Sequence, residues 1–146
     1  MRHYSVSVMR KYCLLLLVVA ALIWSVAGCG GDDEVKARLG QEFSLRIGQT
    51  AAIAGEDLRI SFDEVTEDSR CPRNVTCIWE GRVSCVVQVI EGGSPHALLL
   101  TEYGTGDQNA RENYGEYQIA FHVEPYPEEA DGIPDHEYEL LLTVDK

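Results

Sequence analysis

The chain has 146 residues, of which 24 are acidic and 12 are basic, and its formal net charge is −12 at pH 7. Nucleic-acid phosphates repel a protein of this charge, so the composition excludes nucleic-acid binding. The length is sufficient for one domain with a modest hydrophobic core.

The first 28 residues have the layout of an export signal. Arg2, Arg10 and Lys11 form a positively charged start, and an apolar run from Leu14 to Ala27 follows. As a helix this run would reach only about 21 Å, which is short of the roughly 30 Å hydrocarbon core of a membrane. We therefore expect an export segment that is removed rather than a permanent membrane span.

The end of this segment, Val26-Ala27-Gly28-Cys29, resembles the lipobox of bacterial lipoproteins at all four positions. The resemblance implies that residues 1–28 are removed and that Cys29 is joined to diacylglycerol through its sulfur. Two or three acyl chains, at about 0.8 kcal/mol per buried CH₂, would hold the protein at the membrane. Gly30 after the cysteine implies the outer membrane where an organism has one. The expected location is therefore the extracytoplasmic side of the cell envelope.

Two alternatives to lipidation stay open. Cleavage after Ala27 would release a soluble secreted protein that begins at Gly28 and keeps the thiol of Cys29, and an uncleaved segment would act as an anchor. Nine basic and 24 acidic residues follow Cys29, so the exported part has a formal charge of −15 in each processed form. We interpret this charge as a means of keeping an exported domain soluble.

The segment 29–41 starts with Gly30-Gly31-Asp32-Asp33-Glu34 and is polar, so we expect a flexible tether there. Residues 42–146 are then one domain, in which apolar and polar residues alternate. This alternation predicts strands at residues 43–47, 58–64, 83–90, 98–101, 117–123 and 138–144.

Glycine- and proline-containing turn signals separate these strands, and no segment has a sustained helical period of 3.6 residues. The strand at 83–90 is apolar on both faces, which predicts a central strand. The sequence therefore predicts an all-β fold, a small antiparallel β-sandwich of six or seven strands resembling an immunoglobulin domain, with a barrel as second choice.

Three cysteines lie in the predicted domain. Cys71 and Cys77 flank a loop between two predicted strands, and a disulfide closing this seven-residue ring would contribute about 2.4 kcal/mol. Cys85 falls on the apolar face of a strand, where a reduced thiol acts as a small hydrophobe. We favour the pair Cys71–Cys77. Pairing of Cys77 with Cys85 is the rival, and an unlipidated Cys29 would allow two bridges.

The segment from Ser69-Arg70-Cys71-Pro72 to Cys77-Ile78-Trp79-Glu80-Gly81 resembles a motif of small exported bacterial proteins of uncharacterised function. Phe62-Asp63-Glu64-Val65 and Pro125-Tyr126-Pro127 extend the similarity over much of the domain. The resemblance implies a disulfide and an extracytoplasmic location. It implies no activity, catalytic residue or ligand.

Two residues of this segment have predicted roles. Trp79 should close one end of the sandwich, with its indole N–H turned to a polar partner. The alternative is an exposed platform on which a sugar stacks. Arg70 should form a structural ion pair with Asp68, Glu67 or another carboxylate. Glycan binding also stays open through four tyrosines, although tyrosines at strand ends usually pack: Tyr103, Tyr114, Tyr117 and Tyr126.

Signals for catalysis and for cofactors are weak. His96, His122 and His136 lie on different elements, and Ser94 lacks the Gly-x-Ser-x-Gly turn of hydrolases. The acidic segment 128–135 concentrates oxygen ligands but does not have EF-hand spacing, so a solvated loop is favoured over a calcium site. We expect no enzyme, no metal and no cofactor.

These features together predict a membrane-anchored lipoprotein that acts as a non-catalytic binding or accessory module of the cell envelope. Its partner would be an envelope protein or a glycan, with Arg73 and Trp79 as candidate contact residues. The alternative is an inhibitor or regulator of an envelope protease that presents the 71–77 loop. Arg73 would then be the specificity residue for a trypsin-like enzyme.

Overall fold

The computed structural model describes residues 34–104 and 110–146, so the export segment and the predicted lipidation residue Cys29 lie outside the described residues. The described part contains nine strands and one short 3₁₀ helix. In chain order they are β1 (Val35–Ala37), β2 (Phe43–Arg46), β3 (Thr50–Ile53), β4 (Leu58–Asp68), β5 (Arg82–Glu91), β6 (Ser94–Tyr103), β7 (Ala110–Tyr114), β8 (Tyr117–Glu124), η2 (Asp135–Glu137) and β9 (Glu139–Asp145).

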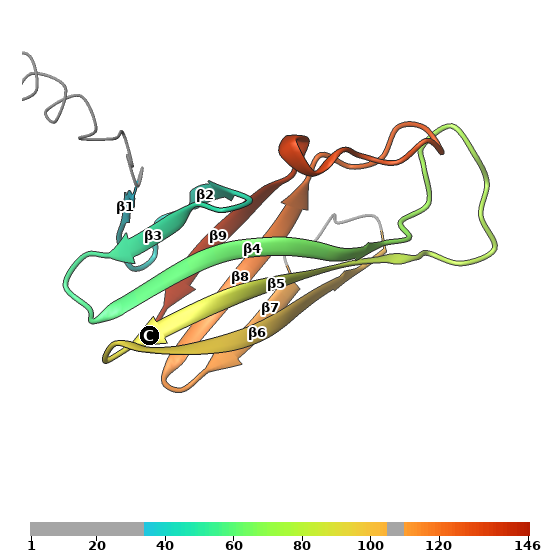
Figure 1. Ribbon diagram of the computed structural model, residues 1–146. Helices are drawn as coiled ribbons and strands as arrows, with labels where there is room; N and C mark the ends of the chain where they lie inside the picture. Colours follow the sequence, from blue (N-terminus) through green and yellow to red (C-terminus); the bar gives the residue numbers. More distant parts are fainter. Residues whose placement is uncertain (1–33, 105–109) are drawn as a thin grey trace, which may run out of the picture. The chain divides into compact units, whose positions relative to one another are not determined.

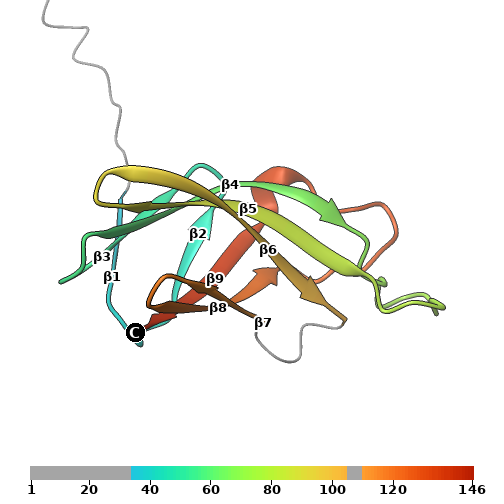
Figure 2. The same ribbon diagram turned by 90° about the horizontal axis from the view of Figure 1, so that it is seen from below.

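The strands form two sheets that face each other (Figures 1 and 2). The five-stranded sheet has the order β1-β3-β4-β5-β6, and the four-stranded sheet has the order β2-β9-β8-β7. All pairings are antiparallel except that of β1 with β3. The predicted β-sandwich is confirmed, and β5 is an inner strand, as its apolar faces indicated.

The core lies between the two sheets. It is built from alternate residues of the strands, since side chains of a strand point in turn to either face. Phe62 of β4 and Val87 of β5 come from one sheet, and Phe121 of β8 and Leu140 of β9 from the other, and all four are at most 1% exposed. Each buried side chain of this size contributes about 1.5–3 kcal/mol.

Part of the predicted tether is folded, and this prediction is wrong for residues 35–39. Val35–Ala37 is strand β1, Ala37 is buried, and Leu39 packs against the core. Three residues of alternation are too short a pattern to distinguish a strand from a polar linker. The folded unit therefore begins before residue 42.

Two further strands were not predicted, which is why the structure has nine strands rather than six or seven. β3 is a four-residue strand with the sequence Thr-Ala-Ala-Ile, in which only the last residue is large and apolar. β7 is an edge strand with the sequence Ala-Arg-Glu-Asn-Tyr and no buried residue. β3 alternates in burial, but two of its four residues are alanines, and β7 buries no residue. Neither sequence therefore shows the apolar–polar alternation that marks a half-buried strand.

The loop that contains the cysteine pair lies at the opposite end of the sandwich from β1 (Figures 1 and 2). Val35 pairs with Ala51, which in turn pairs with Ile60 near the start of β4. The loop, residues 69–81, follows Asp68 at the end of β4. β4 is bulged twice between Ile60 and Asp68, and the partners of these two residues on β5, Val89 and Val83, are six positions apart, which corresponds to about 20 Å.

Candidate functional site

The loop between β4 and β5 is closed by a disulfide between Cys71 and Cys77, whose Cα atoms are 5.9 Å apart. Cys85 is buried on β5 and is reduced. Burial, and to a smaller extent the charge of the nearby Glu102 carboxylate, raises the pKa of the Cys85 thiol to about 12. The favoured pairing is confirmed, and the rival pairing of Cys77 with Cys85 is wrong.

Arg70 fixes the base of this loop to the sandwich. Its side chain is fully buried, and its guanidinium donates to both carboxylate oxygens of Asp68, at 2.9 Å from Nε and 2.6 Å from Nη2. It also donates to the backbone oxygens of Val123, at 2.7 Å, and Pro125, at 2.9 Å. The predicted structural ion pair with Asp68 is confirmed, and it ties the end of β4 to the end of β8.

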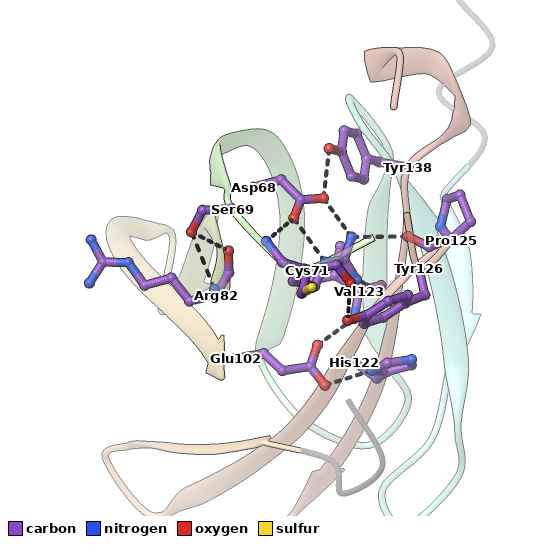
Figure 3. A network of polar contacts seen from close by, with 11 residues as sticks. Asp68, Ser69, Cys71, Arg82, Glu102, His122, Val123, Pro125, Tyr126 and Tyr138 are labelled. Carbon is purple, nitrogen blue, oxygen red and sulfur yellow. Dashed lines mark hydrogen bonds and ion pairs between the residues drawn. The ribbon is translucent and has the colours of Figure 1, made fainter. Parts of the chain in front are cut away.

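Two tyrosines complete the base of the loop (Figure 3). Tyr138 donates its hydroxyl to Asp68 Oδ2 at 3.0 Å. Burial and the adjacent Asp68 charge raise the pKa of Tyr138 to about 12. Tyr126 donates to the Cys71 carbonyl at 2.7 Å, and its ring lies 5.3 Å from the Arg70 guanidinium. These contacts hold the disulfide against the 125–138 segment.

A second buried network joins the two sheets, and the sequence analysis did not find it. Glu102 of β6 is 1% exposed, and its Oε1 lies 2.6 Å from His122 Nδ1 on β8. Its Oε2 accepts the Val123 N–H at 3.1 Å. β7 pairs with β8 only as far as Phe121, so the backbone groups of Val123 are satisfied by the side chains of Glu102 and Arg70. A signal existed: Glu102 continues the inward alternation of β6 at a core position.

Gly81 is where the loop returns to the sheet, and only glycine fits there. Its φ is +71°, and a Cβ atom would lie 2.0 Å from the Ser69 carbonyl oxygen. Gly104, just after β6, donates its N–H to the Gly81 carbonyl at 3.2 Å. The loop is therefore attached at its end as well as at its base.

The tip of the loop carries large apolar side chains in solvent. Ile78 is 91% exposed and Trp79 is 80% exposed. Tyr103, at the end of β6, is 68% exposed. We call these three residues the loop-tip surface. Trp79 and Tyr103 border an open hollow of about 370 Å³, whose other lining residues are Ser69, Glu80, Gly81 and Arg82.

The prediction that Trp79 closes the end of the sandwich is therefore wrong. Arg70, Tyr126 and Tyr138 make the contacts at that end instead. Of the four tyrosines considered for glycan binding, Tyr103 alone is exposed. Tyr117 is buried and donates to Glu56 at 2.8 Å, and Tyr114 and Tyr126 are half-buried.

Arg73, the other candidate contact residue, is bound to its own chain. Its Nε lies 3.1 Å from Glu128 Oε1, and its guanidinium lies 5.0 Å from the Tyr126 ring. Its backbone N–H donates to the Pro127 carbonyl at 3.1 Å. The side chain is 64% exposed, but its charge is paired with Glu128 and is not presented to a partner.

An acidic cleft of about 270 Å³ lies beside the base of the loop, with Glu67, Asp68, Glu129 and Asp135 among its lining residues. Asp68 is paired with Arg70, and the hydrogen bond from Arg82 lowers the pKa of Glu67. Within residues 34–104 and 110–146, no group of three or more His, Cys, Asp or Glu side chains is arranged to hold a metal ion. The predicted acidic segment 128–135 thus contributes two carboxylates to this cleft.

Comparison of the chain with protein-family models, with curated proteins and with solved structures finds no match. In the part of the chain that the structure describes, no helix is both long enough and apolar enough to cross a bilayer.

Proposed function

We propose that the protein is a lipid-anchored, non-catalytic binding module of the cell envelope, and that the loop-tip surface recognises a protein partner. The observation that supports this is the exposure of Ile78 and Trp79 on a loop held by a disulfide and a buried arginine. Burial of one such side chain at an interface contributes about 1.5–3 kcal/mol. A pre-ordered loop also loses little conformational entropy on binding.

The lipobox resemblance at Val26-Ala27-Gly28-Cys29 supports the anchor. Cys29 is six residues before Val35, the first residue of β1, so a lipid on Cys29 would keep the β1 end of the domain near the membrane. The loop-tip surface lies at the other end of the sandwich, about 20 Å further along β4, where a partner can reach it.

The chemistry of the loop-tip surface favours a protein over a glycan. A sugar ring would stack on Trp79 or Tyr103, but it would gain nothing from the exposed aliphatic chain of Ile78. Tryptophan and tyrosine are also the residues that dominate the energetics of protein interfaces. The alternative of a protease inhibitor has less support, since Arg73 is paired with Glu128 and stacked on Tyr126.

The anchor is tested by the intact mass of the protein from the membrane fraction, measured without reduction, before and after alkylation in denaturant. We expect a chain that begins at Cys29 and carries acyl groups, with one alkylated thiol at Cys85. An unlipidated chain that begins at Gly28 would contradict the anchor. Two alkylated thiols beside the Cys71–Cys77 disulfide would show that Cys29 is unmodified.

Recognition is tested by crosslinking in cells with a photoreactive amino acid in place of Ile78. We expect a discrete protein adduct that Trp79→Ala abolishes. The matched control is His136→Ala, which removes an exposed ring from η2 at the same end of the sandwich. Adducts with glycan strands only, or a protein adduct unaffected by Trp79→Ala, would contradict a protein-binding loop tip.

A further inference from the structure

Strand β6 is an outer strand of the five-stranded sheet, paired with β5 on one side. Edge strands are usually protected by charged residues, by proline, by a bulge or by being short, and the proline of β6 is at its second position, Pro95. β6 has ten residues, and none of the eight from Ser94 to Thr101 is Asp, Glu, Lys or Arg. Leu99, in the middle of the strand, is 56% exposed.

The hairpin that joins β5 to β6 determines which residues face the open edge. Gly92 and Gly93 have φ values of +58° and +77°, which fit a two-residue type I′ turn. Such a turn closes on a hydrogen-bonded pair, here Glu91 with Ser94, and hydrogen-bonded and non-hydrogen-bonded pairs then alternate. Pro95, which has no N–H to give, falls in a non-hydrogen-bonded pair, as this alternation requires.

By the same alternation, Ala97, Leu99 and Thr101 form non-hydrogen-bonded pairs with β5, so their N–H and C=O groups point to the open edge. Their side chains project from the sheet face that is turned away from the core. Leu99 lies opposite the half-buried Val86, and Tyr103 follows at the end of the strand beside Trp79. Among the described residues, backbone groups without a strand partner and an apolar strip therefore run together toward the loop-tip surface.

The other sheet edges in the described residues lack this combination. β1 and β2 have three and four residues. β7 has five, including Arg111 and Glu112. By the same alternation, Asn113 of β7 forms a non-hydrogen-bonded pair, as Leu99 does, and its N–H donates to Glu112 Oε1 at 3.4 Å. Among the described strands, β6 is thus the edge best suited to accept another strand.

We propose that β6 binds an extended segment of the partner protein as an additional strand of the sheet, with the segment's end in the hollow beside Trp79 and Tyr103. This inference rests on the proposed function and names its mode of recognition. Backbone hydrogen bonds along β6 supply affinity, and apolar side chains at alternate positions contact Leu99 and Val86. Basic residues flank the segment, since the exported part of the chain, with nine basic and 24 acidic residues, has a net charge of −15.

A second copy of the chain fits this edge less well. Two β6 strands related by a two-fold axis would pair antiparallel, so the β1 ends of the two copies would point in opposite directions. Two lipid anchors would then have to reach one membrane from opposite ends of the pair. Self-pairing would also bring two exported chains of charge −15 together, without any opposite charge on Ser94–Thr101 to compensate.

The experiment uses the full chain in detergent and a phage-displayed library of random twelve-residue peptides as the probe. We expect enrichment of peptides with alternating apolar residues and flanking Lys or Arg. Their affinity is then measured by fluorescence polarisation. Leu99→Pro should weaken binding at least tenfold, because it removes an edge N–H without removing a bond to β5 and without changing charge. Asn113→Pro, the matched control on β7, should leave binding unchanged.

Four results would overturn strand addition: no peptide enriched over the Leu99→Pro protein, equal binding by both variants, peptides without alternation, or a dimer that Leu99→Pro dissociates. If Leu99→Pro does not fold, Leu99→Lys with Asn113→Lys as its control asks the same question. Loss of binding in Trp79→Ala but not in Leu99→Pro would keep the loop-tip surface and reject the strand. Loss in Leu99→Pro alone would keep the strand and reject the loop tip.

Discussion

The base and the tip of the disulfide loop differ sharply, although fewer than ten residues separate them. At the base, Arg70 is fully buried and makes hydrogen bonds to Asp68 and to the backbone of β8 and the residue after it. At the tip, Ile78 and Trp79 are almost completely exposed. At the base, the polar side chains form hydrogen bonds with one another, whereas the apolar side chains at the tip contact mainly solvent.

This difference implies that residues at the base determine the stability of the domain and that residues at the tip determine its recognition of a partner. Removing one partner from a buried ion pair leaves an uncompensated charge, so residues at the base should have large effects on folding. Exposed apolar side chains contribute little to the folded state because they remain in water when the chain folds. The comparison can be tested by substitutions that act on only one of the two regions.

The largest effect is expected for Arg70→Ala. This substitution leaves the Asp68 carboxylate without its cationic partner, and it leaves the carbonyls of Val123 and Pro125 without the guanidinium donor. We therefore expect a loss of about 3–5 kcal/mol in the free energy of unfolding. Urea unfolding measures the change. The control is Arg82→Ala, which breaks an exposed pair with Glu67 and should cost less than about 1 kcal/mol. Equal losses would show that the base is not the stabilising region.

Opening the disulfide should have the next largest effect. Replacing both Cys71 and Cys77 by Ser releases a seven-residue ring, and we expect a loss of about 2 kcal/mol. The urea midpoint of the wild-type protein should fall on addition of a reductant, and that of the double variant should not change. A double variant as stable as the wild type would mean that Arg70 and Tyr126 alone fix the loop.

A smaller effect concerns alkaline pH. The pKa of Tyr138 is raised to about 12 in the folded protein, from an unfolded value near 10, since burial and Asp68 disfavour the phenolate. Its contribution to stability is present below pH 10 and is lost as the pH rises toward 12. Urea unfolding between pH 8 and 11.5 should therefore show a decline that is shallower in Tyr138→Phe. The exposed Tyr103→Phe is the control, and an unchanged decline in Tyr138→Phe would contradict this role.

How far the sequence predicts the fold depends on the length of each strand. β4, β5, β8 and β9 each show several apolar–polar alternations and were found, whereas β1 and β3 are too short and β7 has no buried residue. The cysteine pair was predictable because Cys71 and Cys77 flank one loop, whereas Cys85 falls on the apolar face of a strand. Alternation reports which face of a strand is buried, and it does so without knowledge of the neighbouring strand.

The candidate site was less predictable, because it depends on contacts between distant residues. Trp79 was assigned to the core, but the end of the sandwich is filled by Tyr126 and Tyr138, which lie 47 and 59 positions later in the chain. The open edge of β6 depends on strand order, which periodicity does not contain. Glu102 at an inward position was the one local sign that polar side chains join the two sheets.

The smallest expected effect on folding is that of Trp79→Ala, and it is the most informative about the tip. With 80% of the residue exposed, its removal should change the free energy of unfolding by less than about 0.5 kcal/mol. The same variant should lose the crosslink from position 78, so that folding and recognition respond to different residues. A large loss of stability in Trp79→Ala would mean that the indole supports the loop. Trp79 would then be a structural residue, as Arg70 and Tyr126 are, and not part of a binding surface.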